Sequence, residues 1–355
     1  MVDATRSSEE TQAVRAAHQF DEGKLAEYLA ANLDGFAGPL TVRQFPGGLS
    51  NPTYMLETPK KKYVLRRKPP GVLLKSAHAV DREYRVMSAL HGVGFPVPKP
   101  LVLCGDDSVI GTMFFVMDYI PGRIFIRCAM PELGRAERTK IYDAMNETLA
   151  SLRRVDFNAI GLGDYGRPGN YFARQIARWT TQYEQSKTQE IPEMDRLIQW
   201  LPTAVPPENP PSIVHGDFSF HNVLFHPTEA RVMAVVDWEL STLGDPFGDL
   251  TYHGMEWYRP SDSDGRGSLR DEDLNALGVP TFDEYARTYC RRAGLPEVKD
   301  MSFYRAYNLF RVAAIVQGVV GRAVAAKSPA ADEQAWRVRP IARAAWDEVV
   351  ASGNA

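Results

Sequence analysis

The chain has 355 residues, of which 44% are hydrophobic and 24% are charged, and its formal net charge at pH 7 is -3. At about 100 to 200 residues per domain, this length allows a large core and two lobes. The slightly acidic balance argues against nucleic acid as the main partner, because proteins that bind nucleic acid usually carry a basic excess.

The cysteines, the amino terminus and the longest apolar run predict a cytoplasmic protein with no membrane partner. The three cysteines are widely spaced and form no C-x-x-C pair, which is typical of reduced thiols in a cytosolic enzyme. Residues 1–11 are polar and lack the apolar core of a signal peptide, and we expect a flexible arm over residues 1–20. The longest apolar run, Val312–Val320, is much shorter than the ~20 residues that a bilayer requires.

The first 120 residues predict a small sheet accompanied by helices. Leucines that recur every four residues indicate a helix over residues 21–33, and residues 40–67 have the pattern of strands joined by tight turns. A second helix is predicted over residues 77–91. Short apolar segments at residues 101–105 and 114–119 would complete the sheet.

A change of pattern at Pro121-Gly122 marks the boundary between two predicted lobes, residues 21–120 and residues 121–355. Helical periodicity prevails in the second lobe, with helices predicted over residues 135–153, 170–186 and 282–293. Short strands are predicted around residues 213–215, 223–225 and 232–236. The sequence therefore predicts an α+β fold, with an antiparallel-sheet lobe followed by a larger, mainly helical lobe.

The most informative motif runs from His215 to Asn222 and is followed by the segment V-V-D-W-E, which contains Asp237. Asp217 and Asn222 are five positions apart, the separation found in the kinase catalytic loop H-R-D-x-x-x-x-N. An ionised Asp217 can accept a proton from a hydroxyl, and Asn222 and Asp237 carry the hard oxygen atoms that Mg²⁺ prefers. The alternative is a turn at H-G-D with the second acid capping a strand, but the three residues in this order favour phosphoryl transfer.

These motifs resemble those of the aminoglycoside phosphotransferase family, and the resemblance extends from about Leu40 to Gly321. It implies a bilobal, protein-kinase-like fold in which the first lobe binds ATP and the second carries the catalytic and acceptor-binding residues. It also implies that Asp217 is the catalytic base and that Asn222 and Asp237 hold Mg²⁺. His215 would then brace the loop without taking part in the chemistry.

The first predicted hairpin supplies a candidate phosphate loop. Gly47, Gly48, Ser50 and Asn51 lie between two strand-like runs, where small residues let backbone amides and a hydroxyl approach phosphates. An ordinary hairpin turn is the alternative for an isolated Gly-Gly pair. The position of these residues in the first hairpin, ahead of a basic strand, favours the phosphate loop.

Four further residues complete the expected nucleotide site. Arg66, at the end of the Y-V-L-R run, aligns with the lysine of the V-A-I-K signature, and Glu83 in the following helix is its expected ion-pair partner. The segment F-V-M-D-Y-I-P-G resembles the hinge of the family, which implies that the Asp118 carbonyl and the Ile120 amide recognise adenine. The alternative for Glu83 is an exposed glutamate on a charged helix. The alternative for the hinge segment is an ordinary strand that ends at Pro-Gly.

A more specific resemblance concerns the kinase-like domain that is fused to acyl-CoA dehydrogenases in animals and stands alone in bacteria. The matching segments are Tyr63–Gly71, Ala77–Tyr84 and Phe310–Gly318. This resemblance implies a hydroxyacyl-CoA as the small-molecule hydroxyl acceptor, in fatty-acid breakdown. An aminoglycoside, amino-alcohol or sugar kinase and a catalytically silent nucleotide-binding regulator stay open as alternatives, as does GTP beside ATP. The sequence makes no prediction of the oligomeric state.

Overall fold

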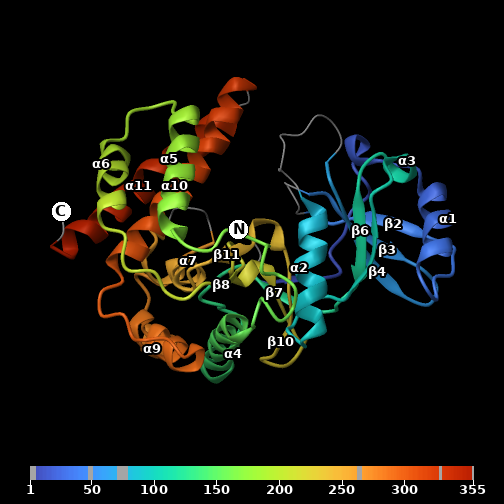
Figure 1. Cartoon of the computed structure of the whole chain (residues 1–355), viewed down its shortest axis with the longest axis horizontal. Coiled ribbons are helices and arrows are strands. Elements are labelled where there is room, and N and C mark those ends of the chain that lie inside the picture. The colour runs from blue at the N-terminus through green and yellow to red at the C-terminus, as the bar shows by residue number, and fades with distance from the viewer. Residues whose placement is uncertain (1–4, 47–50, 70–78, 262–265, 328–329, 354–355) are drawn as a thin grey trace.

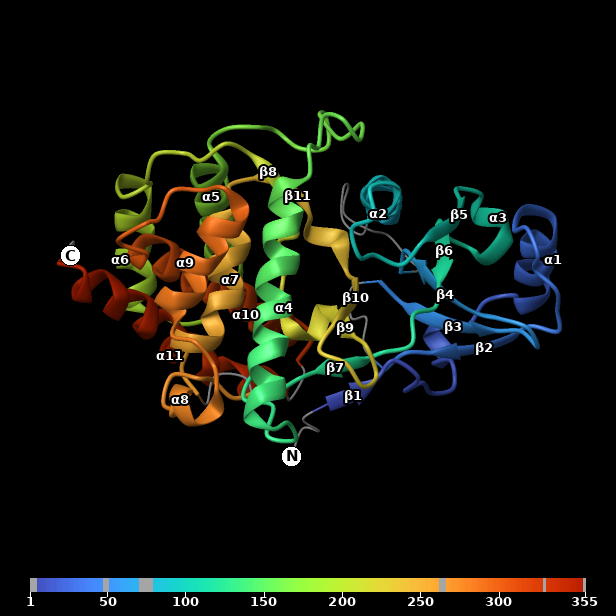
Figure 2. The ribbon, with the colours of Figure 1, turned by 90° about the horizontal axis from the view of Figure 1, so that it is seen from below.

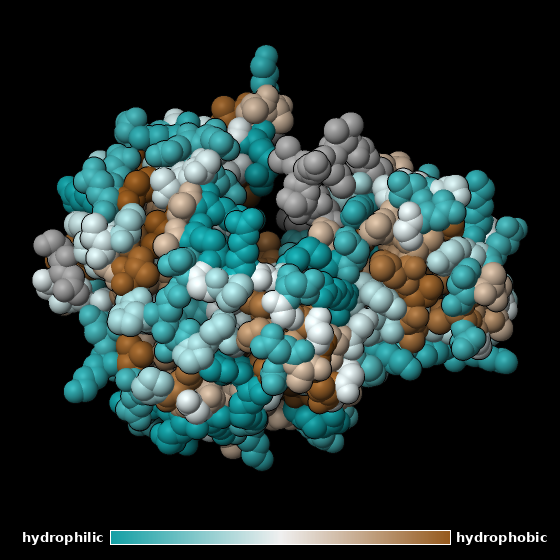
Figure 3. Space-filling model, in the orientation of Figure 1, coloured by the Kyte–Doolittle hydropathy of each residue, from teal (hydrophilic) through white to brown (hydrophobic). Residues whose placement is uncertain are grey.

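The structure is a computed structural model that describes residues 5–46, 51–69, 79–261, 266–327 and 330–353. A small lobe built on a sheet lies beside a larger lobe built mainly of helices (Figure 1). The space-filling view shows a hollow between the two lobes on the same face (Figure 3). The predicted α+β fold, with a sheet lobe preceding a larger helical lobe, is confirmed.

The small lobe is an antiparallel sheet in which alternate residues serve two different cores. In spatial order its strands are β2 (Thr41–Gln44), β3 (Thr53–Glu57), β4 (Lys62–Arg67), β6 (Phe114–Asp118) and β5 (Pro100–Cys104). Consecutive residues of a strand point to opposite faces of a sheet. Leu65 and Val116 accordingly pack in the core beneath α1, whereas Val64 and Met117 belong to the large core shared with α2 and the second lobe.

Helices accompany the small sheet; the first two lie close to their predicted ranges, whereas the third was not predicted. These helices are α1 (Glu22–Asn32), α2 (Val80–Gly92) and the short α3 (Asp107–Ile110). The Asp21 side chain caps α1 by accepting a hydrogen bond from the Lys24 amide at 3.0 Å, which satisfies one of the free donors of the first turn. Asp106 caps α3 in the same way, through the Ser108 amide.

The amino-terminal segment is not the flexible arm that we expect from its polar sequence. The strand β1 (Thr5–Ser7) pairs antiparallel with β7 (Arg123–Phe125) of the larger lobe, and Figure 2 shows the two strands side by side at the junction of the lobes. Farther along, Gln12 forms a β-bridge with Gln44 of the small lobe, ahead of the short helix η1 (Ala16–His18). Backbone pairing with both lobes therefore fixes residues 5–20, where polar composition alone indicates no such partner.

Two short sheets belong to the larger lobe, and the first of them lies on the side that faces the small lobe (Figure 2). The first has the spatial order β1-β7-β9-β10, and the second pairs β11 with β8. The bounds of the strands not yet given are β8 (Ser212–Val214), β9 (Val223–Phe225), β10 (Val232–Val235) and β11 (Thr242–Gly244). The predicted strands around residues 213–215, 223–225 and 232–236 correspond to β8, β9 and β10.

Helices make up the rest of the larger lobe. They are α4 (Arg135–Arg154), α5 (Tyr171–Ser186), α6 (Pro192–Trp200), α7 (Phe247–Tyr258), α8 (Leu274–Leu277), α9 (Phe282–Ala293), α10 (Ser302–Ala325) and α11 (Ala330–Ala351), with the 3-10 turns η2 (Leu201–Thr203), η3 (Phe220–Asn222) and η4 (Trp238–Leu240). A capping box starts α9, with Thr281 and Glu284 each bonded to the backbone of the other. Among the described residues, α10 alone has the length and apolar composition of a membrane span, but 56% of its most apolar window is buried inside the lobe.

Candidate active site

The loop after β8 is held from below by Asp249 of α7. The Asp249 carboxylate accepts hydrogen bonds from the backbone amides of His215 at 2.6 Å and Gly216 at 2.8 Å. Gly216 has a φ of 84°, and a Cβ at this position would lie 2.6 Å from the Leu240 carbonyl oxygen. Only glycine fits such a conformation and such an approach. This explains the glycine that replaces the arginine of the H-R-D pattern.

His215 is a bracing residue inside this loop, as the family resemblance implies. Its Nδ1 accepts a hydrogen bond from the Asp217 amide at 3.1 Å, so its Nε2 carries the proton and donates to the Val236 carbonyl at 3.0 Å. The ring is fully buried and packs edge-on against Trp238, with centroids 4.6 Å apart. His215 thereby joins the segment that carries Asp217 to the segment that carries Asp237.

Asp217 and Asn222 lie in direct contact. The Asn222 Nδ2 donates to the Asp217 carboxylate Oδ2 and to the Asp217 main-chain carbonyl, both at 2.9 Å. The second carboxylate oxygen of Asp217, Oδ1, is buried and meets no donor at hydrogen-bonding geometry within the described part of the chain. A buried carboxylate oxygen without a donor is costly, and it marks the place where a substrate hydroxyl could donate.

Asp237 faces an arginine that links both lobes. The chain turns sharply at Asp237, which adopts a left-handed conformation with φ 66°, one that aspartate tolerates better than most residues. The Arg66 guanidinium lies 2.9 Å from the Asp237 carboxylate and 3.1 Å from that of Glu83. Burial acts to raise the pKa of Asp237, but the charge of Arg66 outweighs it and the pKa lies below its ordinary value.

The structure brings Arg66 and Glu83 together, as the sequence predicts. Both side chains are buried, and Glu83 also accepts a hydrogen bond from the Trp238 amide at 3.2 Å. Burial raises the pKa of Glu83 against the opposing charge of Arg66. Asn51 lies at the same cluster and donates to Glu239 at 2.9 Å. The other predicted phosphate-loop residues lie outside the described residues: Gly47, Gly48 and Ser50.

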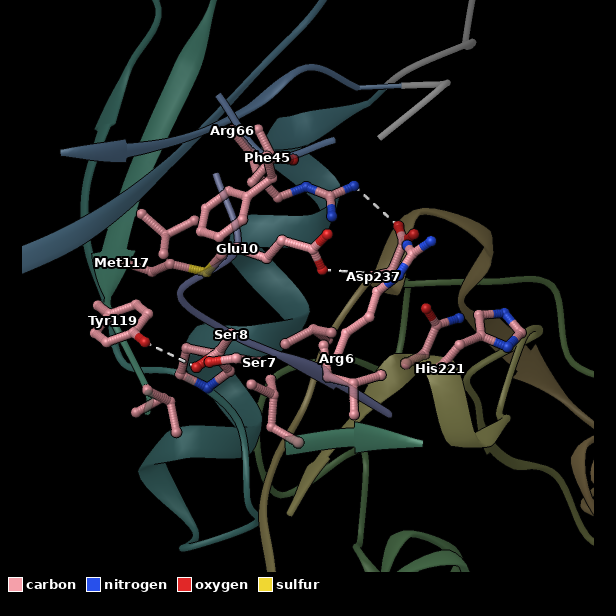
Figure 4. Close-up of a pocket in the computed structure, with 18 of the residues that line it drawn as sticks. Arg6, Ser7, Ser8, Glu10, Phe45, Arg66, Met117, Tyr119, His221 and Asp237 are labelled. Atoms are coloured by element: carbon pink, nitrogen blue, oxygen red, sulfur yellow. Dashed lines mark hydrogen bonds and ion pairs between the residues drawn. The ribbon is translucent and has the colours of Figure 1, made fainter. Parts of the chain in front are cut away.

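A cavity of about 360 Å³ opens between the lobes, and Arg66 and Asp237 line one end of it (Figure 4). The predicted hinge residues Asp118 and Ile120 line it, together with Met117 and Tyr119. Apolar side chains form the walls above and below: Phe45, Val64, Ile124, Ile126, Leu224 and Val236. Asn222 and Asp237 line the cavity as well, whereas Asp217 lies beyond Asn222. A flat apolar slot that leads to carboxylate and amide oxygens suits a purine nucleotide.

Arg311 of α10 also contacts the catalytic loop. Its guanidinium is buried, donates a short hydrogen bond to the Gly216 carbonyl, and lies over the rings of Tyr252 at 4.7 Å and Trp179 at 5.4 Å. Tyr252 in turn lies near Asp217, whose charge adds to the effect of burial in raising the pKa of the phenol. Arg311 therefore supports the catalytic loop through Gly216, next to His215.

The fold and the site together define a phosphotransferase with a protein-kinase-like architecture. The APH model, which describes a phosphotransferase enzyme family, matches residues 41–307. The chain belongs to this family. It is 47% identical to a solved structure from Ralstonia eutropha that is provisionally named an aminoglycoside phosphotransferase, with a TM-score of 0.85 over 94% of this chain and 99% of that one.

The solved aminoglycoside phosphotransferase APH(4)-Ia shares only the fold. Its ternary complex with ADP and hygromycin B is 14% identical, with a TM-score of 0.59 over 92% of this chain and 98% of that chain. This neighbour was solved with a nucleotide and an acceptor bound.

Curated relatives of this chain are acyl-CoA dehydrogenase family members. The chain is 44% identical over 346 residues to member 10 of the mouse, and the matched region covers 97% of this chain and 32% of that protein. It is 42% identical over 313 residues to human member 11, which covers 86% of this chain and 40% of that protein. The chain thus spans less than half the length of these relatives, and it corresponds to their kinase-like domain.

Proposed function

We propose that this phosphotransferase is a Mg²⁺-dependent kinase that transfers the γ-phosphoryl group of ATP to the hydroxyl of a hydroxyacyl-CoA. The observation that carries the kinase chemistry is the meeting of Asp217, Asn222 and Asp237 at the end of a cavity whose far side is lined by Asp118 and Ile120. Phosphoryl transfer mainly requires an aligned acceptor, a nearby base and neutralisation of the phosphate charge. Asp217 would supply the base, and Asn222 and Asp237 the ligands of a metal ion that neutralises the phosphates.

In this proposal Asp217 accepts the proton of the acceptor hydroxyl at its free oxygen, Oδ1. Asn222 holds the other oxygen at 2.9 Å, and this bond fixes the orientation of the carboxylate. Asp249, His215 and Arg311 fix the backbone of the loop, so the base does not move away as the reaction proceeds. Positioning of this kind lowers the barrier because the alignment is established before the reaction.

The residues fit a magnesium ion by the chemistry of their donors. Asn222 turns its Nδ2 toward Asp217, so its carbonyl oxygen is the atom left to bind a metal, and Asp237 provides a carboxylate. Mg²⁺ typically takes one or two protein carboxylates and completes its shell with phosphate and water oxygens. When bound, it would neutralise charge on the nucleotide phosphates.

The acceptor assignment is supported by the relatives and by the charges of the larger lobe. The relatives at 42% to 44% identity are named as acyl-CoA dehydrogenase family members, so acyl-CoA chemistry is the context of this domain. A polycationic antibiotic would need a strongly acidic cleft. The neighbouring acids Asp271, Glu272 and Asp273 of the second lobe are exposed, and Asp273 caps α8. We also propose a cytoplasmic location, since the three cysteines are free, buried thiols.

The test is an ATP-consumption screen of the full chain with Mg²⁺ against hydroxyacyl-CoAs, aminoglycosides, choline and sugars, with the phosphorylated product identified by mass spectrometry. We expect turnover with hydroxyacyl-CoAs, and a loss of roughly 10²-fold or more in Asp217→Asn, as is typical of an acid or base group. Nucleotide binding should survive in that variant. Turnover of aminoglycosides alone would overturn the acceptor assignment, and a fully active Asp217→Asn would remove Asp217 from the mechanism.

A further inference from the structure

The amino-terminal strand contributes a charged side chain to the floor of the cavity. In the β1-β7 pair, Arg6 lies directly opposite Ile124, and the pairing of Arg123 with Phe225 brings Ile124 next to Leu224 of β9. Residues that face one another on neighbouring strands share one face of the sheet. Ile124 and Leu224 line the cavity from below, and Arg6 lines it as well. The neighbouring residues Leu224, Ile124 and Arg6 thus form a row across β9, β7 and β1, and the last of them is a cation.

Ser8 fixes this strand against the hinge. The Ser8 amide donates to the Gly122 carbonyl at 3.0 Å, and the Gly122 amide donates back to the Ser8 hydroxyl at 2.9 Å. The same hydroxyl lies 2.8 Å from the phenolic oxygen of Tyr119. Ser8 is buried, so these bonds are shielded from water. The strand therefore keeps a defined position relative to the residues expected to bind adenine.

The Arg6 side chain extends from β1 across the cavity toward Asp237 (Figure 4). Its ion pair with Glu10 is loose, because the Nε–Oε2 distance is 3.8 Å and the two side chains are 44% and 55% exposed. Exposed pairs of this kind contribute at most about 1 kcal/mol. A stronger anion placed between Arg6 and Asp237 would therefore attract the guanidinium away from Glu10.

Beside the proposed magnesium ion, the phosphate end of the cavity suits a further cation. Arg66 faces three carboxylates at once, those of Glu83 at 3.1 Å, Asp237 at 2.9 Å and Glu239 at 3.9 Å. One positive charge is already outnumbered there before a polyphosphate enters. A magnesium ion at Asn222 and Asp237 would neutralise part of the charge of two or more phosphates, and a further cation would reduce the repulsion that remains. Arg6 is aimed at this place from the opposite wall.

We propose, on the basis of the proposed function, that Arg6 binds the polyphosphate of the nucleotide and that the amino-terminal strand is thereby part of the nucleotide site. A guanidinium offers several N–H donors in a planar fork that matches phosphate oxygens. The base lies in the apolar slot near the hinge, and the phosphates run past Arg6 to Asn222 and Asp237. The loose pair with Glu10 allows the guanidinium to turn toward these phosphates.

Calorimetric titration of the full chain with ATP and with adenosine, both with Mg²⁺, tests this assignment. We expect Arg6→Ala to weaken ATP binding roughly 10-fold or more, as for a lost charge-assisted hydrogen bond, and to leave adenosine binding unchanged. Arg6→Lys should restore part of the affinity for ATP. The matched control is Arg43→Ala, which removes an exposed arginine that donates to Thr11 of the same segment at 2.8 Å but does not line the cavity. It should bind both ligands like the parent chain.

The outcomes separate this inference from the proposed function. Equal ATP affinity in Arg6→Ala and the parent chain would overturn the role of Arg6 and leave the kinase assignment in place. Equal losses for ATP and adenosine would also overturn it, because they would indicate a displaced strand instead of a lost phosphate contact. A parent chain that binds neither ligand would overturn both proposals together.

Discussion

Individual residues of the catalytic loop could be predicted because their spacing is local. Asp217 and Asn222 are five positions apart, and their side chains meet at 2.9 Å. Apart from His215, the residues that hold this loop could not be predicted from spacing. Asp249 contacts the loop from 33 and 34 positions away and Arg311 from 95 positions away, and neither contact follows a short motif. The spacing of residues in a motif indicates contacts within that motif. The contacts that hold the loop depend on how the distant helices α7 and α10 pack against it.

His253 shows what burial does to a single ionisable residue in this lobe. Its ring is buried among Phe218, Phe220, Trp257 and Tyr285, and both ring nitrogens lack a hydrogen-bond partner among the described residues. Burial lowers the pKa of His253 to about 4, although the charge of Glu256 opposes this shift. The unfolded chain therefore binds a proton near pH 6.5 that the folded chain takes up only near pH 4.

We expect stability to fall as the pH falls from about 6.5 toward 4, because the unfolded state binds more protons in this window. The contribution of His253 to this loss is on the order of 3 kcal/mol. Urea unfolding of the parent chain and of His253→Phe at pH 7 and at pH 4.5 measures it. The variant should lose clearly less stability between the two pH values, and an identical loss in both proteins would contradict the assignment.

At the scale of elements, strand and helix positions follow from periodicity, but contacts between elements do not. The helices α1, α4, α5 and α9 lie within a few residues of their predicted ranges, since each has a clear apolar face. The apolar run Val312–Val320 lies inside α10, which extends from Ser302 to Ala325. The strand β1 was not predicted, because three polar residues on the edge of a sheet carry no alternating pattern.

The position of Arg311 on α10 makes this helix a support of the catalytic loop, and we expect Arg311→Met to lower kcat roughly 10- to 100-fold. The KM for ATP should change little, because Arg311 contacts Gly216 and not the nucleotide cavity. Steady-state kinetics and thermal melting of the variant test this split. Arg322→Met, at an exposed position of the same helix, is the control and should retain full activity. A rise in KM with unchanged kcat would contradict the supporting role.

At the scale of the whole molecule, the bilobal fold could be predicted because the motifs of the nucleotide site precede the catalytic motifs along the chain. The cavity lies between the lobes because residues of both sets of motifs line it. The site combines Arg66 and Glu83 of the small lobe with Asp237 of the large lobe, so one ion-pair cluster spans both. A ligand bound here contacts both lobes, and its binding free energy adds to the stability of the whole chain.

We therefore expect Mg²⁺ and a non-hydrolysable ATP analogue together to raise the melting temperature. At a ligand concentration 100 times its Kd, the stabilisation is about 2.7 kcal/mol. Removing the metal with EDTA should abolish most of this shift, and Asp237→Ala should abolish the same part even when Mg²⁺ is present. Differential scanning calorimetry measures both effects. A shift that EDTA leaves unchanged would argue against a magnesium ion at Asn222 and Asp237.

The pairing of β1 with β7 has a consequence for how the chain is assembled. Thr5–Ser7 lie in the sheet of the larger lobe, the chain then crosses to the small lobe at Gln12, and it returns at the hinge near Gly122. During synthesis β1 has no partner until residues 123–125 have followed it, more than a hundred positions later. Cutting the chain between residues 120 and 121 would leave the first strand of the larger lobe attached to the smaller one. The two lobes are distinct in shape, but along the chain they are interleaved.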